Sequence, residues 1–429
     1  MTYQQTIEYL YSRLPVFHRI GKAAYKADLN NTLALCKHLG NPERKFKSIH
    51  IAGTNGKGSS SHMLAAILQS AGYKTGLYTS PHLKSFTERI RVNGEEMPEQ
   101  KVVEFVEANK AFIEDVQPSF FELTVGMAFD YFAQEKVDIA VIEVGLGGRL
   151  DSTNVIQPEV SLITNISWDH TDILGDTLEK IAGEKAGIIK ENTPVVISEY
   201  QQDIEHVFVN KAKQEHAPLY FASQHIDLQD KTFVADKRFV SLEENGLYTL
   251  TLQLSLVGDY QLKNVAGVIQ TVRILQQKGW KIDDSHIQQG IANTVQLTGL
   301  KGRWQVLAEK PLTICDTGHN EGGIRFIVEQ LKRLSYEKLH IVMGVVNDKD
   351  PEKVLKLLPQ DAFYYFCQAH LPRAMDAELL AQKGEMHELK GIVIPDVNDA
   401  LAEARRRAST NDVIFIGGST FVVAELKEL

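Results

Sequence analysis

The sequence has few cysteines and no long hydrophobic run. Its 429 residues include three cysteines, Cys36, Cys315 and Cys367, which lie far apart without the spacing of metal ligands. Their odd number makes a disulfide framework improbable. No segment approaches the ~18 uninterrupted apolar residues of a membrane-spanning helix, and the amino-terminal segment lacks a basic start followed by an apolar stretch. We therefore expect a cytoplasmic protein that is neither exported nor bound to a membrane.

A basic excess is also absent, because 55 acidic residues outnumber 46 basic ones. General nucleic-acid and membrane surfaces carry the opposite balance, so we expect neither partner. The sequence contains no His-Glu-x-x-His, no paired Cys-x-x-Cys and no Gly-x-Ser-x-Gly motif. Hydrolases that depend on those motifs are therefore excluded.

The chain has an ordinary globular composition, with 43% hydrophobic and 24% charged residues, and its length predicts two domains. Short apolar runs alternate with helical patterns, which is typical of a parallel sheet covered by helices. The segment Ser59 to Ser70 has helical periodicity and connects the first two runs in a β-α-β unit. The predicted strands of this first domain are 47–52, 76–79, 139–144 and 160–165.

A change of pattern marks the second half of the chain. Residues 219–256 alternate polar and apolar side chains, which predicts a small appendage of antiparallel strands. The segment TGLKGRW, with two glycines and no apolar period, then predicts a boundary between domains 1–297 and 298–429. The fold class is therefore α/β: a P-loop ATPase-type parallel sheet domain with a β appendage, followed by a doubly wound, Rossmann-like domain. The predicted strands of the second domain are 312–315, 339–343, 362–366, 391–394 and 413–416.

The strongest local motif is Gly53-Thr54-Asn55-Gly56-Lys57-Gly58-Ser59, between a predicted strand and a predicted helix. Glycines allow backbone N–H groups to converge on phosphate oxygens, and a helix N-terminus adds partial positive charge. Lys57 supplies a full positive charge. The spacing differs from the usual P-loop, because Gly53 lies three positions before Gly56. An ordinary glycine-rich turn is the alternative, but the flanking strand and helix favour a phosphate-binding loop.

Polar residues follow several predicted strands. Glu143 ends one apolar run and should lie at the carboxyl edge of the same sheet, where a carboxylate suits Mg²⁺. On its own, such a glutamate is more simply a cap or a surface pair. His170 follows the next strand and could add a ligand, although a lone histidine is more often structural. In the second domain, Asp316 to Asn320 and Gly417 to Thr420 hold the same strand-end position, so we expect the two sheets to present polar loops to a cleft.

Eight short motifs follow one another along the chain. They are GTNGKGS at 53–59, TSPHL at 79–83, ERIRVNG at 88–94, EVGLGGRLDSTN at 143–154, DHTDILG at 169–175, EKAGI at 184–188, GRW at 302–304 and DTGHN at 316–320. In this order they resemble the folylpolyglutamate synthase and dihydrofolate synthase family, within the ATP-dependent Mur ligase superfamily. The last motif departs slightly, because Gly318 stands where the family usually has alanine.

The resemblance implies an ADP-forming ligase. A substrate carboxylate would take the γ-phosphoryl group of ATP, and the amine of L-glutamate would then displace phosphate to leave an amide. A carboxylate is inert to amines until its oxygen becomes a good leaving group, and a dry cleft protects an acyl phosphate from water. The implied acceptors are dihydropteroate and reduced folates, and we expect the enzyme to act as a monomer.

The resemblance also implies roles for individual residues. Lys57, His170 and Lys185 would be catalytic, and Lys185 matches a lysine that CO₂ carbamylates, although an ordinary ion-paired lysine is what the sequence alone favours. About two Mg²⁺ ions are implied. ATP would bridge the two domains. The implied sets are Asn55, Gly56, Lys57, Gly58, Ser59, Asn264, Arg303 and Asp316 for ATP; Ser80, Glu143, His170 and Lys185 for metal; Phe120, Phe121, Glu122, Leu150 and Asp151 for pteroate or folate; and His319 and Ser419 for glutamate.

Three alternatives stay open at this point. The enzyme could extend folates without making dihydrofolate, or it could be a Mur-type ligase that adds an amino acid to a nucleotide-linked precursor. The TSPHL and ERIRVNG segments count against the second of these. A regulatory P-loop switch that hydrolyses ATP slowly would belong to another class, and only product analysis separates it from a ligase.

Overall fold

The computed structural model describes residues 1–15, 28–234, 237–347 and 351–429. It divides into two compact units. Unit 1 contains Met1–Ser255 and Gln261–Gly299, and unit 2 contains Leu256–Tyr260 and Leu300–Leu429. The sequence placed the boundary at 297/298, and it did not assign the short segment 256–260 to the second unit. Within the described ranges, no helix is long and apolar enough to cross a membrane.

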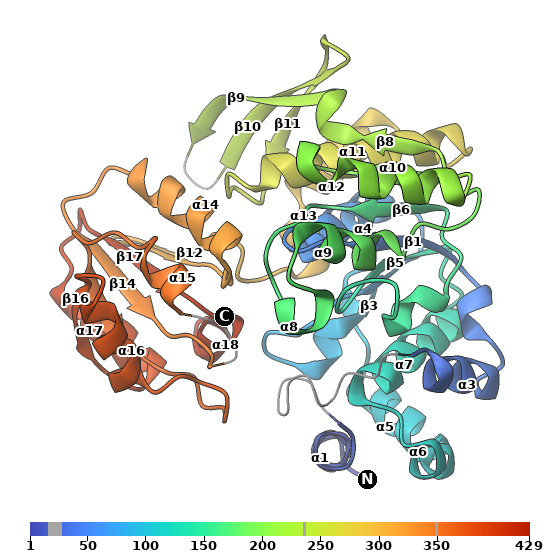
Figure 1. The fold of residues 1–429 in the computed structure, drawn as a ribbon, viewed down its shortest axis with the longest axis horizontal. Coiled ribbons are helices and arrows are strands. Elements are labelled where there is room, and N and C mark those ends of the chain that lie inside the picture. Colours follow the sequence, from blue (N-terminus) through green and yellow to red (C-terminus); the bar gives the residue numbers. More distant parts are fainter. Residues whose placement is uncertain (16–27, 235–236, 348–350) are drawn as a thin grey trace. The chain divides into compact units, whose positions relative to one another are not determined.

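Unit 1 is built on an eight-stranded sheet in the order β4-β3-β2-β5-β1-β6-β7-β8 (Figure 1). Strands β2, β5, β1, β6, β7 and β8 run parallel to one another. Strands β3 and β4 add an antiparallel edge beside β2. The parallel strands are short and, apart from the edge strand β8, almost fully buried, as expected where helices cover both faces. The strands are β1 Lys47–Ala52, β2 Thr75–Tyr78, β3 Ile90–Val92, β4 Glu95–Glu96, β5 Ile139–Glu143, β6 Val160–Ile163, β7 Val195–Ile197 and β8 Leu219–Phe221.

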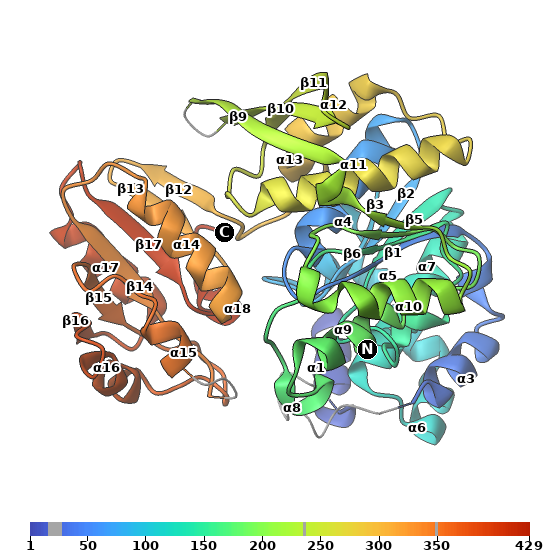
Figure 2. The same cartoon turned by 45° about the horizontal axis from the view of Figure 1, so that its top comes forward.

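Helices cover both faces of this sheet (Figure 2). On one face, Ala140 and Ile142 of β5 share a core cluster with helix α7, and Ile163 of β6 shares another with α9 and α10. Helices α4 and α11 pack on the other face. The helices of unit 1 are α1 Tyr3–Arg13, α3 Asn30–His38, α4 Lys57–Ser70, α5 Glu99–Ala108, α6 Lys110–Val116, α7 Phe120–Glu135, α8 Thr171–Leu174, α9 Leu178–Ala186, α10 Glu205–Gln214, α11 Gln261–Gln277, α12 Asp284–Ala292 and α13 Thr294–Thr298.

Helix α4 differs from the expected amphipathic helix. It begins at Lys57 rather than Ser59, and every residue from Ser59 to Leu68 is buried. The cause is tertiary, because α4 packs against α11, which contacts the same sheet, and also against α12 and α13. Gly290 of α12 permits one close approach, since a Cβ atom there would lie 2.5 Å from the Ile67 Cα atom.

The β appendage is a three-stranded antiparallel sheet of β9 Ile226–Val234, β10 Lys237–Glu244 and β11 Leu247–Leu254. One part of the prediction was wrong. Residues 219–221 form β8, which pairs in parallel with β7 at the edge of the main sheet. Alternating polarity does not distinguish a half-exposed edge strand of a parallel sheet from an antiparallel strand, because both leave one face in solvent.

Unit 2 is a mixed six-stranded sheet in the order β12-β13-β17-β14-β15-β16. Strand β12 is antiparallel to β13, and the other neighbours are parallel. Its core contains Ile341, Tyr364 and Phe415 from three neighbouring strands. The elements are β12 Gln305–Glu309, β13 Leu312–Cys315, α14 Glu321–Lys332, β14 Leu339–Met343, α15 Glu352–Leu355, β15 Phe363–Phe366, α16 Ala377–Glu385, β16 Lys390–Val393, α17 Val397–Arg407, β17 Val413–Gly417 and α18 Thr420–Glu425.

Candidate functional site

The predicted phosphate loop lies between β1 and α4, at the carboxyl edge of the main sheet. Gly56 forms the N-cap of α4 with a left-handed backbone (φ 86°) and no side-chain cap. The N–H groups of the first helical turn have no partner within a helix, so those of Lys57, Gly58 and Ser59 are donors for an anion. This is the local geometry that the Gly53–Ser59 motif predicts.

Two glycines of this loop are required by close contacts as well as by φ. A Cβ atom on Gly53 (φ 145°) would lie 1.8 Å from the Thr164 Oγ1 atom. One on Gly56 would lie 2.1 Å from the Asn264 Oδ1 atom. Asn264 of α11 is therefore in direct contact with the phosphate loop, and the structure brings this predicted ATP ligand together with the Asn55–Ser59 group.

The loop is also fastened to the segment after β6. The Thr54 N–H donates to the Asn165 carbonyl oxygen over 2.9 Å, and the Asn55 N–H donates to the Asn165 side chain over 2.9 Å. The Asn55 side chain donates to Ser167 Oγ over 3.2 Å. Asn165 and Ser167 belong to the segment that leads to Asp169 and His170, so these hydrogen bonds hold the loop close to that pair.

The two predicted catalytic lysines meet at the phosphate loop. The Lys57 ammonium donates to the carbonyl oxygens of Gly53 and Thr54, over 3.0 and 3.2 Å. Lys185, on α9, is 4% exposed and donates to the same Gly53 oxygen over 2.9 Å. Burial, followed by the positive charge of Lys57, lowers the pKa of Lys185 to about 7. A lysine in this position is therefore partly neutral near neutral pH, which an exposed lysine is not.

Two of the predicted metal ligands meet at the neighbouring strand ends. Glu143 is buried at the end of β5, and the Ser80 N–H donates to its carboxylate over 3.3 Å. His170 caps α8 with a left-handed backbone (φ 48°), and its N–H donates to the Asp169 carboxylate over 3.0 Å. Among the residues that the structure describes, no three His, Cys, Asp or Glu side chains are grouped so as to hold a metal by themselves.

The predicted pteroate segment lies at the start of α7, and its three residues have different environments. Phe120 is buried, stacks on Tyr11 with ring centroids 5.0 Å apart, and belongs to a core cluster. Glu122 closes the capping box of α7 by accepting from the Ser119 N–H, and it also accepts from Asn31 over 3.2 Å. Phe121 is only partly buried. Of the three, Phe121 is the side chain best placed to contact a ligand.

The glycine-rich loop after β5 packs beside Phe121. A Cβ atom on Gly145 would lie 2.4 Å from the Phe121 ring, so this glycine lets the ring approach the backbone. Asp151 is buried and accepts from the N–H groups of Leu146 and Thr153, over 2.8 and 3.0 Å. Burial raises the pKa of Asp151. Asp151 thus shapes the loop from inside, whereas Leu150 is partly exposed beside it.

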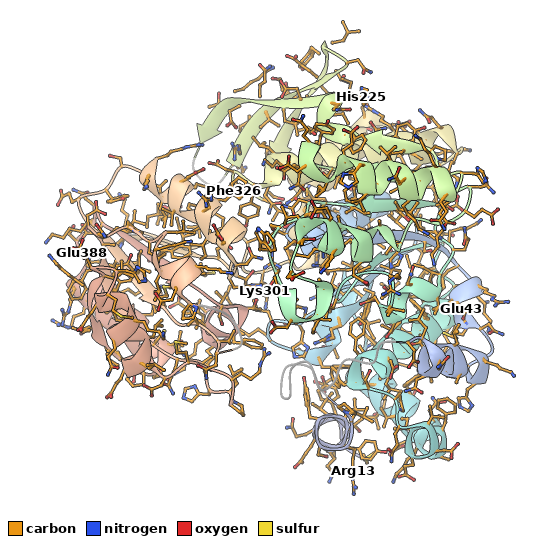
Figure 3. The ribbon with its side chains drawn as sticks, in the orientation of Figure 1. Arg13, Glu43, His225, Lys301, Phe326 and Glu388 are labelled. Atoms are coloured by element: carbon orange, nitrogen blue, oxygen red, sulfur yellow. The ribbon has the colours of Figure 1, made fainter. Side chains whose placement is uncertain are left out.

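In unit 2, Asp316 connects three segments. Its buried carboxylate accepts from the Trp304 N–H, the Tyr260 hydroxyl and the Gly318 N–H, each over 2.7 Å. Burial raises the pKa of Asp316. Tyr260 also packs edge-on against Phe326 of α14, which is labelled in Figure 3. These contacts give Asp316 a structural role that the sequence did not indicate.

Of the other predicted residues of unit 2, His319 and Ser419 follow the carboxyl ends of β13 and β17, and Arg303 precedes β12, which is antiparallel to β13. Arg303 is partly exposed and donates to Thr317 Oγ1. His319 is also partly exposed, and its Nδ1 atom is 2.9 Å from the Thr317 carbonyl oxygen. Ser419 is buried and caps α18, where its Oγ atom accepts from the N–H groups of Phe421 and Val422 over 3.0 and 3.3 Å. Their roles toward ATP and glutamate remain predictions.

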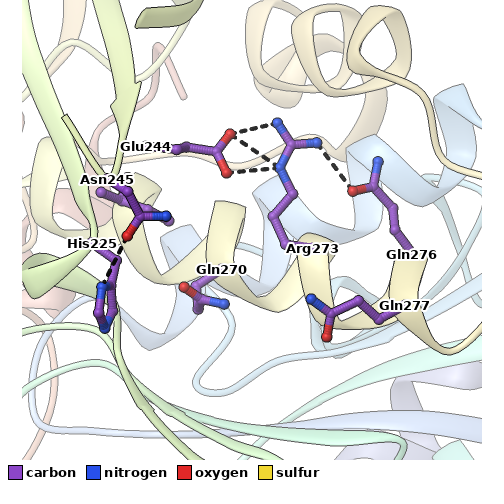
Figure 4. A pocket seen from close by; sticks show the side chains of 8 residues that line it. His225, Glu244, Asn245, Gln270, Arg273, Gln276 and Gln277 are labelled. Carbon is purple, nitrogen blue, oxygen red and sulfur yellow. Dashed lines mark hydrogen bonds and ion pairs between the residues drawn. The ribbon is translucent and has the colours of Figure 1, made fainter. Parts of the chain in front are cut away.

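A hollow of about 280 Å³ lies between the β appendage and α11, away from the phosphate loop (Figure 4). Arg273 dominates its wall, and the donors of this side chain are taken by Glu244, Asp284 and Gln276 over 2.6 to 3.1 Å. The positive charge of Arg273 is therefore neutralised by the carboxylates of Glu244 and Asp284. None of the predicted site residues lines this hollow.

One residue of the phosphate site was missed from the sequence. Gln261, the first residue of α11, is fully buried and donates to Ser59 Oγ over 3.0 Å. It lies one helical turn before Asn264, and that spacing was the available signal. A glutamine is a common surface residue, however, and its burial could not be predicted without knowing that α11 covers α4.

The chain is similar to known proteins over nearly its whole length. The Mur ligase middle domain matches residues 51–272, and the glutamate ligase domain of Mur ligases matches residues 302–420. A dihydrofolate synthase/folylpolyglutamate synthase from Bacillus subtilis is 33% identical over 99% of this chain and 98% of its own length. The chain belongs to the dihydrofolate synthase/folylpolyglutamate synthase family. A folylpolyglutamate synthase from Lacticaseibacillus casei is also 33% identical, over 100% of the chain and 98% of its own length.

Solved structures of family members have the same fold. Escherichia coli FolC in complex with DHPP and ADP superposes with a TM-score of 0.85 at 28% identity, covering 99% of this chain and 96% of FolC. The Mycobacterium tuberculosis folylpolyglutamate synthase complexed with ADP and AMPPCP gives a TM-score of 0.86 at 29% identity, covering 99% and 97%. The family resemblance and the α/β fold class predicted from the sequence are thereby confirmed.

Proposed function

We propose that the chain is an ADP-forming ligase that joins L-glutamate to dihydropteroate, giving dihydrofolate, and to the glutamate tail of reduced folates. The reaction proceeds through an acyl phosphate and releases ADP and phosphate. The observation that carries this proposal is the phosphate loop with two lysines on one carbonyl oxygen, in a chain that matches folate ligases over nearly its whole length. Relatives solved with ADP and with DHPP support ATP and a pterin as substrates.

The phosphate loop would bind the β- and γ-phosphates of ATP. Its free N–H groups and the α4 N-terminus provide partial positive charge, and Lys57 provides a full charge. Lys57 now donates to two backbone carbonyl oxygens, and a γ-phosphate is a stronger acceptor than either. Phosphoryl transfer depends mostly on positioning and charge neutralisation, so Lys57 would orient the γ-phosphoryl group toward the acceptor carboxylate. Asn264, Arg303 and Asp316 are proposed to complete nucleotide binding.

The residues present fit magnesium. Glu143 and Ser80 offer a buried carboxylate and a hydroxyl within one hydrogen-bonded pair, which are the hard oxygen donors that Mg²⁺ prefers. Mg²⁺ usually keeps several waters and uses substrate phosphates as ligands, so a cage made only of protein side chains is not required. Glu143, Ser80 and His170 would hold the ion, and its chemistry there is to neutralise charge on the phosphates.

Lys185 is the proposed site of carbamylation. The pKa of Lys185 is lowered to about 7, so a neutral amine is available to form an N–C bond with CO₂ and release a proton to solvent. The product carries a negative charge where the unmodified side chain carries a positive one. The carbamate would lie on the other side of the Gly53 carbonyl oxygen from Lys57. Its two oxygens would be further ligands for a second Mg²⁺.

The acceptor is proposed to lie against Phe121, Leu150 and the loop around Gly145, with Phe120, Glu122 and Asp151 forming the layer behind them. An aromatic ring suits a flat pterin. Glutamate is proposed to bind on unit 2 near His319 and Ser419, where both residues follow strand ends. We also infer that the enzyme works as a monomer in the cytoplasm, without nucleic acid.

Product analysis tests the proposed function. Purified protein is incubated with ATP, Mg²⁺, L-glutamate and either dihydropteroate or tetrahydrofolate, and the products are measured by mass spectrometry together with ADP. We expect one amide bond per ADP with both acceptors. ADP release without an amide would indicate a P-loop switch instead. Amide formation with tetrahydrofolate alone would leave the polyglutamate synthase activity only, which is the activity named for the L. casei relative.

A further inference from the structure

Three buried polar side chains form a chain of hydrogen bonds behind the phosphate loop. The Asn264 side-chain N–H donates to Gln261 Oε1 over 2.8 Å, and the Gln261 side-chain N–H donates to Ser59 Oγ over 3.0 Å. The exposed fractions are 6%, 0% and 1% for Asn264, Gln261 and Ser59. No solvent competes for these groups, so the bonds fix the orientation of each side chain.

The direction of these bonds determines what Ser59 can offer a ligand. Its oxygen already accepts one hydrogen bond from Gln261. A hydroxyl has one hydrogen and two lone pairs, so the Ser59 hydrogen and one lone pair remain for other partners. Ser59 lies in the first turn of α4, beside the N–H groups of Lys57 and Gly58, which have no partner within the helix. Its hydroxyl can therefore donate to a phosphate oxygen without losing a bond that it already makes.

The side-chain amide of Gln261 also orients Asn264, which contacts the loop at Gly56. Because Gln261 accepts from the Asn264 N–H, the Asn264 oxygen is turned toward Gly56, where only a glycine leaves room for it. We propose that Gln261 is a positioning residue for nucleotide binding, which acts through Ser59 and Asn264 and aligns the phosphate loop before ATP arrives. This inference rests on the proposed ATP-dependent function and adds a residue to its nucleotide site.

The neighbouring Ser60 provides a matched control. It follows Ser59 on α4 and is equally buried, but within the described part of the chain its Oγ atom has no hydrogen-bond partner. Replacing Ser60 by alanine thus removes a hydroxyl of the same kind from the same helix without touching the Gln261 bonds.

The test is a double-mutant cycle read out by ADP and ATP binding calorimetry and by the KM for ATP. Gln261→Met keeps the length of the side chain and removes both hydrogen bonds. We expect it to weaken nucleotide binding about 10-fold in the wild type and in the Ser60→Ala background. In the Ser59→Ala background we expect only about a 3-fold loss, because the Ser59 bond is already gone and only the Asn264 bond remains to be lost. The KM for ATP should rise more than kcat falls.

Equal losses in all three backgrounds would overturn the inference, because Gln261 would then act independently of Ser59. If Gln261→Met lowers the yield of folded protein, Gln261→Asn replaces it in the cycle, since the shorter amide cannot span both partners. Absence of ATP binding by the wild-type protein would contradict the proposed function itself, and it is therefore distinguishable from a failed cycle.

Discussion

Lys57 and Lys185 donate to the same carbonyl oxygen, that of Gly53, over 3.0 and 2.9 Å. Two ammonium groups on one acceptor repel each other, and the buried one, Lys185, has its pKa lowered to about 7 by burial and by Lys57. The loop therefore holds two lysines together, and the lowered pKa leaves Lys185 partly neutral near neutral pH.

The first prediction concerns the pH dependence of folding stability. The pKa of Lys185 is lowered from 10.5 to about 7, so the unfolded chain binds more protons between these values, and stability rises with pH there. Replacing Lys185 by Met removes this dependence. We expect the variant to gain on the order of 5 kcal/mol over the wild type below pH 7, and this gain should vanish toward pH 10.5.

Urea unfolding at several pH values measures this difference, in buffers stripped of CO₂. Lys180→Met is the control, because Lys180 lies on the same helix but is exposed and paired with Asp176. A pH-independent difference between the wild type and Lys185→Met would show that Lys185 is protonated throughout.

A second prediction concerns carbamylation itself. Lys185→Ala should lose activity, and a short carboxylate such as acetate should partly restore it by supplying the missing anionic oxygens. The restored rate should rise with acetate concentration and stay absent with chloride at the same ionic strength. A crystal structure of the metal-loaded enzyme with a bare Lys185 amine would refute the carbamate.

A third prediction is that Lys57→Met abolishes amide formation. The change removes the full charge that faces the γ-phosphoryl group, so we expect kcat/KM to fall about 1000-fold or more. The fold should remain, since the hydrogen bonds of the Lys57 ammonium to described residues go to carbonyl oxygens of the loop. Circular dichroism and thermal unfolding check the fold, and Lys74→Met, which loses only a surface pair with Glu135, is the control. Wild-type turnover by a folded Lys57→Met protein would exclude Lys57 from the reaction.

A fourth prediction separates metal binding from other effects of the strand-end residues. Glu143→Ala and His170→Ala should raise the Mg²⁺ concentration for half-maximal activity about 10- to 100-fold, with partial recovery at saturating Mg²⁺. Activity is titrated against Mg²⁺, with the surface variant Glu135→Ala as control. An unchanged Mg²⁺ titration would count against each residue as a ligand.

A fifth prediction distinguishes two neighbouring phenylalanines. Phe121 is partly exposed beside Gly145, so Phe121→Ala should lower kcat/KM for dihydropteroate about 10-fold and affect tetrahydrofolate less. Phe120 is a core residue, so Phe120→Ala should lower the free energy of unfolding by about 3–5 kcal/mol. Kinetics with both acceptors and chemical unfolding check the pair. Equal losses with both acceptors would show that Phe121 does not distinguish dihydropteroate from tetrahydrofolate.

Much of the fold could be predicted from local patterns. The Gly53–Ser59 motif, the short apolar strands and the restart of alternation after residue 302 depend on neighbours in sequence, through backbone conformation and side-chain period. Strand β8 shows the limit of local patterns, because the sequence predicted an antiparallel strand there. Its parallel pairing depends on β7, a strand that local polarity does not identify as the partner.

The sequence by itself determined the phosphate loop, the α/β class and the family, since these follow from residue types in a fixed order. Only the tertiary structure decided that Lys57 and Lys185 share the Gly53 oxygen and that Gln261 is buried against Ser59. It also decided that Phe120 is buried in the core, whereas Phe121 packs against that core and stays partly exposed. These contacts join segments that are far apart in the chain. Burial, pKa values and hydrogen-bond partners depend on which segments meet, and that is set by the packing of the whole sheet and its helices.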